Sequence, residues 1–183
     1  MSIPYDVIII GAGAAGMMSA IEAGKRGRKV LLVDHYKKIG EKIRISGGGR
    51  CNFTNIHTNP NKFLSQNPKF VKSALSQYTQ NDFINLINKY EIKFHEKKLG
   101  QLFCDHSAQQ IVEMLLKECE LANVTIIKEF IIKNVTKEND QYLISTETDK
   151  YSSQSLIVAT GGLSVPKIGA TSFGYEIAKK FDH

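Results

Sequence analysis

The fold of this chain is decided by residues 7–34, which read VIIIGAGAAGMMSAIEAGKRGRKVLLVD. The stretch opens on the apolar run 7–10 and closes on the apolar run 30–33, and both runs have the pattern of buried strands. Apolar residues at helical spacing lie between them. This order predicts a βαβ unit with a glycine-rich turn after its first strand, and hence an α/β fold with a Rossmann-like sheet.

The glycine-rich turn, Gly11-Ala12-Gly13-Ala14-Ala15-Gly16, has the G-x-G-x-x-G spacing of dinucleotide-binding folds. Gly11 would permit the tight turn, Gly13 the close approach of a pyrophosphate, and Gly16 the close packing of helix against strand. The pyrophosphate would lie at the helix N-terminus, where unpaired N–H groups favour an anion. Asp34 ends the second strand, where an acid can accept hydrogen bonds from a ribose. This unit predicts dinucleotide binding, with FAD and NAD as alternatives because both contain ADP.

Composition indicates a globular chain with a local excess of positive charge. The chain has 183 residues, of which 42% are hydrophobic, and this is enough to bury a core. Lys and Arg number 24 against 18 acidic residues, and residues 25–50 hold most of the excess. Such a segment suits an anionic cofactor, although a solvated helix end would equally explain Lys25, Arg26, Arg28 and Lys29. No apolar run has the length of a signal peptide core or a membrane span, so we expect a cytoplasmic protein without a membrane partner.

The cysteines give no sign of a disulfide framework or a zinc site. Cys51, Cys104 and Cys119 are widely spaced and form no C-x-x-C pair, which fits a reducing compartment. Cys119 falls on the apolar side of a predicted helix and is expected to be a packed thiol. No metal is expected, and the sequence contains no G-x-S-x-G motif that would support hydrolysis.

Beyond Asp34 the pattern predicts a long loop, then helices, then strands. Residues 35–62 show neither helix nor strand period and are interpreted as a functional loop. Three helices are expected here. The first begins at Pro68, the second follows a cap at Thr79 or Asn81, and the third follows a capping box at Ser107 and Gln110. Alternating patterns predict strands over 124–130, 131–137, 141–147 and 155–160, and a last helix is expected around 173–181.

A second informative stretch is Ser46-Gly47-Gly48-Gly49-Arg50-Cys51-Asn52. Consecutive glycines expose backbone N–H groups, which suits a loop laid against a flat or anionic ligand. Arg50 can add a charge-assisted hydrogen bond. A flexible linker is the alternative, and the adjoining Arg, Cys and Asn make it the less favoured one.

Three motifs together resemble a family of bacterial flavoproteins. They are DVIIIGAGAAG at 6–16, ISGGGRCNFTN at 45–55 and ATGGLSVP at 159–166. In these motifs the sequence is similar to the BaiN-like NAD(P)/FAD-dependent oxidoreductases, which are related to aminoacetone oxidase. The resemblance covers essentially the whole chain. It implies an FAD-binding domain of glutathione-reductase type with a β-meander excursion, in which the Ala-Thr-Gly strand returns to the cofactor.

The resemblance also implies which residues hold FAD. Asp34 would bind the adenosine ribose, Ile132 would contact adenine through its backbone, and Lys42 with residues 46–52 would approach the flavin. Cys51 would pack against the cofactor, and a redox role for its thiol stays open. The cofactor-binding residues implied in this way are Gly11, Gly13, Ala14, Ala15, Gly16, Asp34, His35, Lys42, Ser46, Gly47, Gly48, Gly49, Arg50, Cys51, Asn52, Ile132, Ala159, Thr160, Gly161 and Gly162.

Two positions depart from the family pattern. Asp34 stands where glutamate is more common, so its carboxylate reaches less far, and Cys104 stands where proline is more common. The resemblance implies a flavin-dependent oxidoreductase with a small-molecule substrate, no nucleic-acid partner, and NAD(P)H as a candidate electron donor. No catalytic residue is assigned. The alternatives are an NAD-binding dehydrogenase fragment, an inactive binding module and a basic nucleic-acid-binding module.

Residues 1–183 are expected to form the N-terminal portion of the FAD-binding domain of an enzyme about twice as long. In such enzymes a substrate domain and a C-terminal closing segment follow the Ala-Thr-Gly motif. Without them, apolar residues would be exposed and the chain would self-associate.

Overall fold

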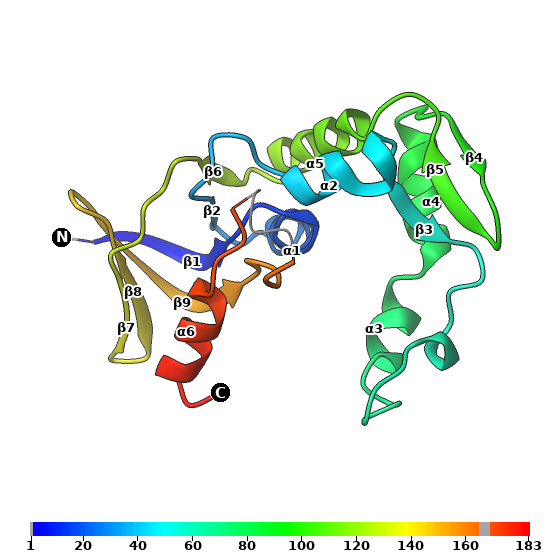
Figure 1. The fold of residues 1–183 in the computed structure, drawn as a ribbon. Coiled ribbons are helices and arrows are strands. Elements are labelled where there is room, and N and C mark those ends of the chain that lie inside the picture. Colours follow the sequence, from blue (N-terminus) through cyan, green and yellow to red (C-terminus); the bar gives the residue numbers. More distant parts are fainter. Residues whose placement is uncertain (1, 165–168) are drawn as a thin grey trace. The chain divides into compact units, whose positions relative to one another are not determined.

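The structure is a computed structural model that describes residues 2–164 and 169–183. The chain forms two compact units (Figure 1). The sheet unit comprises the chain up to Lys42 and from Leu115 onward, and the insert unit comprises residues 43–114. The expectation that residues 1–183 belong to one FAD-binding domain stays a prediction.

A mixed sheet of six strands, in the order β6-β2-β1-β9-β8-β7, forms the sheet unit (Figure 1). Its strands are β1 (Ile3–Ile10), β2 (Val30–Val33), β6 (Thr125–Ile127), β7 (Asn134–Glu138), β8 (Gln141–Ser145) and β9 (Lys150–Val158). β1 runs parallel to β2 and β9, and β2 runs parallel to β6. β7, β8 and β9 form an antiparallel meander. The Rossmann-like α/β fold and the meander expected from the sequence are confirmed.

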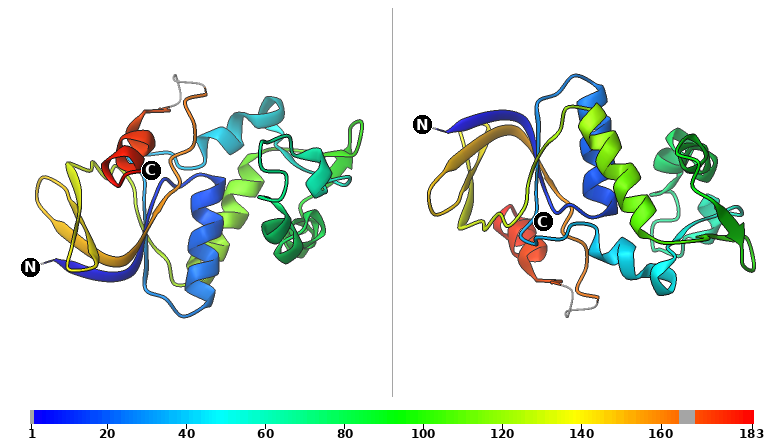
Figure 2. Two further views of the ribbon diagram at one scale, coloured as in Figure 1. Left: turned by 90° about the horizontal axis from the view of Figure 1, so that it is seen from below. Right: turned by 90° about the horizontal axis from the view of Figure 1, so that it is seen from above.

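Helices cover both faces of this sheet. α1 (Ala14–Lys25) lies on one face with the later part of α5 (Gln109–Leu121) beside it, and α6 (Phe173–Lys180) lies on the other face (Figure 2). On the α6 side, Ile177 joins a buried cluster with Ile8 and Leu31, because alternate strand residues point to that face. Among the described residues, no helix is both long and apolar enough to cross a membrane.

Small residues bring α1 close to its neighbours. A Cβ atom on Gly16 would lie 1.8 Å from the carbonyl oxygen of Gly11. A Cβ atom on Gly24 would lie 2.3 Å from the carbonyl oxygen of Ala122. The Sγ atom of Cys119 lies 3.8 Å from the carbonyl oxygen of Met17, and its side chain is fully buried, which confirms the packed thiol. The helix can approach β1 and α5 this closely only where side chains are missing or small.

The insert unit contains a small antiparallel sheet in the order β3-β5-β4. Its strands are β3 (Asn52–Asn55), β4 (Phe94–Glu96) and β5 (Gln101–Cys104). The short helix α2 (Glu41–Ile45) leads into this unit, and α3 (Lys72–Gln77) and α4 (Gln80–Lys89) follow. Thr79 caps α4 through a reciprocal pair of hydrogen bonds with Asp82, which confirms the cap that the sequence placed at Thr79 or Asn81.

Several predicted boundaries are wrong. Residues 35–62 contain α2, β3 and 3₁₀ turns at Ser46–Gly49 and Pro60–Lys62, which are too short to show a period in the sequence. Pro68 does not begin a helix, because α3 starts at Lys72. Strands β4 and β5 escaped prediction for the same reason of length. Strand β6 ends at Ile127, before the end of the strand expected over 124–130. Strand β9 begins at Lys150, directly after the Thr146–Asp149 turn, and is longer than the strand expected over 155–160.

Apolar side chains are exposed on the insert unit. The exposed fraction is 98% for Leu64, 78% for Phe70 and 81% for Leu99. The self-association expected from the sequence stays a prediction.

The backbone contact at Gly16 gives a testable prediction. We expect Gly16→Ala to lower the melting temperature, because overpacking typically costs about 1–3 kcal/mol and the atom in the way is backbone. Each kcal/mol corresponds to about 2–4 °C in a protein of this size. Gly13→Ala is the matched control, since Gly13 has φ of −84° and its added Cβ meets no described atom within 4 Å. Equal melting temperatures for the two variants, measured by circular dichroism, would contradict the close packing.

Candidate functional site

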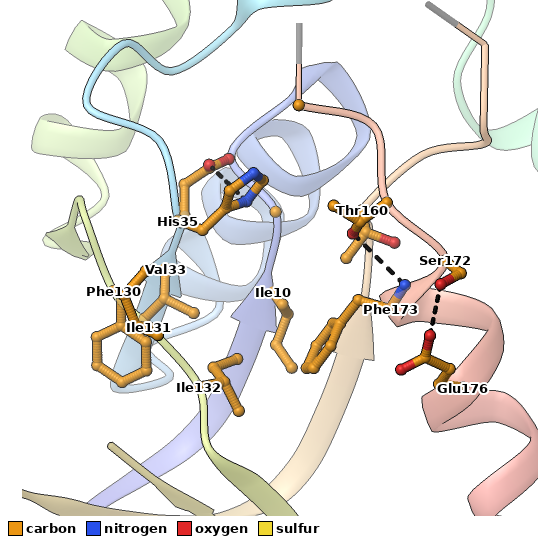
Figure 3. Close-up of a pocket in the computed structure, with 14 residues that line it drawn as sticks. Ile10, Val33, His35, Phe130, Ile131, Ile132, Thr160, Ser172, Phe173 and Glu176 are labelled. Carbon is orange, nitrogen blue, oxygen red and sulfur yellow. Dashed lines mark hydrogen bonds and ion pairs between the residues drawn. The ribbon is translucent and has the colours of Figure 1, made fainter. Parts of the chain in front are cut away.

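A pocket of about 360 Å³ lies in the sheet unit at the carboxyl ends of β1, β2 and β9 (Figure 3). Ligands of open α/β sheets bind at this edge, outside the carboxyl ends of the parallel strands. The lining residues are Ile10, Gly11, Val33, Asp34, His35, Phe130, Ile131, Ile132, Thr160, Gly169, Thr171, Ser172, Phe173 and Glu176.

The pocket has apolar walls and a polar rim. Figure 3 shows Ile10 beside Phe173, and Phe130 and Ile132 along the segment that leads to the meander. Phe130 is buried, its ring packs edge-on against Tyr151 at 5.2 Å between centroids, and its N–H donates to the Asp34 carbonyl. These contacts fix the apolar wall in place. An apolar cavity with a few polar groups at its rim suits a planar ring joined to a sugar.

Gly11 shapes the turn that borders the pocket. Its φ is +104°, and a Cβ atom would lie 2.5 Å from the carbonyl oxygen of Ala159. The Gly11 N–H donates to the carbonyl of Val33 at 2.8 Å, and the Ala159 N–H donates to the carbonyl of Ile10 at 2.8 Å. The turn is therefore held against the ends of both neighbouring strands, and a side chain at Gly11 would push the backbone out of this position.

Gly13 opens an anion cradle next to this turn. It is the N-cap of α1, and no described side chain caps the helix there. A Cβ atom at Gly13 would meet no described atom within 4 Å, and Ala14 and Ala15 are exposed. The first N–H groups of a helix lack intrahelical partners and carry the positive end of the helix dipole. The space and the donors together fit a pyrophosphate.

Asp34 ties the glycine-rich turn to the end of β2. Its Oδ2 accepts a hydrogen bond from the Ala12 N–H at 2.7 Å, and its Oδ1 accepts one from the Tyr36 N–H at 2.9 Å. The side chain is only 15% exposed. A carboxylate has about four acceptor positions, so capacity for a ligand hydroxyl remains. The sequence suggested a ligand-binding role for Asp34 and gave no hint that it also holds the turn.

Residues at the start of α6 form a wall that sequence reasoning missed. Ser172 Oγ donates to the Glu176 carboxylate, and the Phe173 N–H donates to Thr171 Oγ1 (Figure 3). Phe173 closes the pocket floor against Ile10, and Glu176 brings a second carboxylate to the rim. The only sequence signal for this wall was the Ser-x-x-x-Glu spacing at the helix start, which is also common at helices that bind no ligand.

Within the sheet unit, the structure brings together several residues of the predicted cofactor site. Gly11, Asp34, His35, Ile132 and Thr160 line the pocket. Gly13, Ala14, Ala15 and Gly16 belong to the adjoining turn and α1, and Ala159, Gly161 and Gly162 lie at the exit from β9. Lys42 Nζ donates to the Gly162 carbonyl at 2.7 Å and to Ser164 Oγ at 3.2 Å. Ser46, Gly47, Gly48, Gly49, Arg50, Cys51 and Asn52 belong to the insert unit.

The triple-glycine stretch of the insert unit forms a compact turn. Gly47, Gly48 and Gly49 all have positive φ, at +59°, +68° and +85°. The Cys51 N–H donates to the Ser46 carbonyl at 3.0 Å, and the Ala108 N–H donates to the Gly49 carbonyl at 2.7 Å. These bonds favour an ordered loop over a flexible linker. In the described part of the chain, His, Cys, Asp and Glu side chains form no group of three or more that could hold a metal ion.

Comparison with known proteins places the chain in a family. The model of the HI0933-like protein Rossmann domain matches residues 5–183. The chain belongs to the HI0933-like family. The Rossmann-type domain expected from the sequence is confirmed by this family.

Individual HI0933-like relatives carry different names. Ribosomal RNA dihydrouridine synthase of Escherichia coli (strain K12) is 54% identical over 97% of this chain and 44% of its own length. The protein of that name from Haemophilus influenzae is 51% identical over 99% of this chain and 46% of its own length. The 3-dehydro-bile acid delta(4,6)-reductase of Clostridium scindens is 24% identical over 96% of this chain and 43% of its own length. The chain spans less than half the length of these curated relatives, and the BaiN-like assignment is supported only in part.

Solved structures with the same fold include a dehydrogenase and a halogenase. The match with the 3-ketosteroid-delta4-(5alpha)-dehydrogenase of Rhodococcus jostii RHA1 covers 88% of this chain and 46% of the dehydrogenase chain. Its TM-score is 0.62 and the sequence identity is 11%. The match with the halogenase PltM, solved with phloroglucinol and FAD, covers 89% of this chain and 35% of the halogenase chain. Its TM-score is 0.52 and the sequence identity is 18%. At these identities the likeness shows the fold alone.

The double role of Asp34 gives a second prediction. Asp34→Ala removes the acceptors of the Ala12 and Tyr36 N–H groups, and we expect the melting temperature of the ligand-free protein to fall. The cost of a lost hydrogen bond with a charged acceptor is about 1.5–3 kcal/mol. Asp34→Asn keeps one carbonyl oxygen as acceptor and should have an intermediate effect. If Asp34→Ala melts like the wild type in a thermal scan, the carboxylate does not hold the turn.

Proposed function

We propose that the sheet unit binds FAD through its ADP portion, with the adenosine in the pocket and the pyrophosphate at the N-terminus of α1. The observation that carries this proposal is the open cradle at Gly13 directly next to a pocket with Asp34 at its rim. A structural turn has no need of empty space at an uncapped helix start. A dinucleotide has the two features that these neighbouring sites match, an anion and a sugar with hydroxyl donors.

The lining of the pocket offers matching groups for each end of the proposed adenosine. Phe130, Ile131 and Ile132 offer apolar surface for the adenine ring. Asp34 accepts from the ribose hydroxyls with the lone pairs that Ala12 and Tyr36 leave unused. FAD is favoured over NAD by the motif resemblance and by the fold shared with a halogenase solved with FAD.

FAD, once bound, supplies reversible transfer of two electrons, which the twenty amino-acid side chains do not provide. The residues of this chain bind and orient it. The α1 N-terminus fixes the pyrophosphate, and the Gly11 junction holds that helix start in a constant position relative to the pocket. Lys42, bonded to the Gly162 carbonyl, holds the exit from β9 in place.

For the substrate we propose uridine in ribosomal RNA, reduced by the complete protein to dihydrouridine in the cytoplasm. Support comes from the names of two relatives that are 54% and 51% identical across nearly this whole chain. Formation of dihydrouridine adds two hydrogens across the C5–C6 bond of uracil, a reduction suited to a flavin with NAD(P)H as the electron donor. The net charge of +6 also suits a polyanionic partner. This proposal departs from the small-molecule substrate expected from the sequence, which the structure does not test.

Flavin binding is tested by titration of the protein with FAD, followed by flavin fluorescence. Gly13→Val should weaken binding at least tenfold, because its side chain would occupy the phosphate space. Asp34→Ala should weaken it about 5-fold to 150-fold, from the loss of about 1–3 kcal/mol. Asp6→Ala is the matched control, since Asp6 accepts from the Lys29 N–H at 2.7 Å outside the pocket lining. Wild-type affinity in the folded Gly13→Val variant, or no competition by AMP, would refute the assignment.

The substrate is tested in cells. We expect deletion of the gene to remove dihydrouridine from ribosomal RNA, as measured by mass spectrometry of its nucleosides. A plasmid copy of the wild-type gene should restore it, and a copy with Gly13→Val should not. Unchanged dihydrouridine in the deletion strain would reject ribosomal RNA as the substrate and leave the FAD site to be judged by titration.

A further inference from the structure

We propose that Cys51 and Cys104 of the insert unit form a reversible intramolecular disulfide when a small-molecule disulfide acts as the oxidant. The inference rests on the geometry of β3 and β5 and is independent of the proposed FAD site. The spacing of the two cysteines in the sequence gave no sign of it.

The two cysteines are brought together by strand pairing. Asn52 of β3 is the ladder partner of Phe103 in β5, and the Cys104 N–H donates to the Arg50 carbonyl at 2.9 Å. Cys51 lies just before β3, between the Arg50 carbonyl that accepts from Cys104 and the Asn52 that pairs with Phe103, so its backbone lies next to that of Cys104. Backbone segments paired by such hydrogen bonds lie about 4.7–4.9 Å apart. A disulfide requires a Cα separation of about 4.4–6.8 Å, so the two distances are compatible.

The buried surroundings of the two cysteines favour an uncharged disulfide over two charged thiolates. Cys51 is 6% exposed and Cys104 is fully buried. Burial raises the pKa of Cys51, and burial together with the neighbouring Cys51 and Asp105 raises the pKa of Cys104 to about 12. A disulfide carries no charge, so it removes the conflict that two thiolates would create in this place.

The backbone at Cys51 makes the bond relevant to the glycine loop. Cys51 has φ of +49°, which is uncommon for a residue with a side chain, and its N–H closes the loop onto the Ser46 carbonyl. A bond from Cys51 to Cys104 would anchor the end of the 46–51 loop covalently to β5. The loop would then be restrained in its oxidised form and held by hydrogen bonds alone in its reduced form.

The reaction balances with oxidised glutathione as the oxidant. The Cys51 thiolate attacks one sulfur of glutathione disulfide, which forms a mixed disulfide and releases one glutathione thiolate. Cys104 loses its proton and attacks the Cys51 sulfur, which releases the second glutathione. Two protein thiols are oxidised, and one glutathione disulfide is reduced to two thiols. Cys51 is the expected first nucleophile, because the pKa of Cys104 is raised further by the adjacent groups.

The test incubates the purified full-length protein with oxidised glutathione and digests it without reduction. We expect mass spectrometry to show a peptide pair joined through Cys51 and Cys104, which dithiothreitol separates. Cys119→Ala, which alters a buried thiol of the sheet unit, should leave the product unchanged. Cys51→Ser and Cys104→Ser should each abolish it. The rate should rise by up to about 100-fold from pH 7 to pH 9, since the raised pKa values leave little thiolate at neutral pH.

Two further outcomes decide against the proposal. Prolonged incubation of the folded protein without any Cys51–Cys104 peptide would overturn it, provided that the urea-unfolded protein reacts at all of its thiols. Bonds that involve Cys119, or that join two molecules, would also overturn it. A second readout is the melting temperature, which should be higher for the oxidised than for the reduced protein and should be unaffected by oxidant in Cys104→Ser.

Discussion

The contact between the backbones of Gly11 and Ala159 is the constraint on which the sheet unit depends. At this point the end of β1, the start of α1 and the exit from β9 pass one another at distances that exclude side chains. The hydrogen bonds from Gly11 to Val33 and from Ala159 to Ile10 fix the three strand ends in register. The α1 N-terminus and the pocket therefore have a defined mutual position that comes from the sheet itself.

The sequence predicted this part of the molecule well, because each of its signals is local. The run 7–10, the glycine spacing and the run 30–33 each identify an element without knowledge of its neighbours. The helix α1 and the strand β2 follow these signals closely, whereas β1 begins earlier, at Ile3. Thr79, one of the two caps expected, caps α4 through a capping box that is complete within four residues of sequence.

The remainder of the site could not be predicted, because it depends on contacts between distant segments. Phe130 and Phe173 become neighbours of Asp34 only when the chain folds, and neither has a pattern that marks a ligand site. The hydrogen bond between Asp34 and the Ala12 N–H likewise cannot be predicted from the sequence. The sequence shows an acidic residue at the end of a strand but not the donor of its hydrogen bond. The short strands of the insert unit escaped because three or four residues cannot display a period.

The bond from Asp34 to Ala12 also bears on the thermodynamics of ligand binding. The glycine-rich turn has few side chains that could restrain it, yet the Asp34 carboxylate accepts a hydrogen bond from its backbone without any ligand. The conformational entropy of the turn is therefore lost during folding rather than on association. A phosphate-bearing ligand would meet a preorganised surface, so its binding enthalpy would be offset by little ordering of the protein. Heat-capacity changes on binding would then report mainly the apolar area of the pocket that the ligand covers.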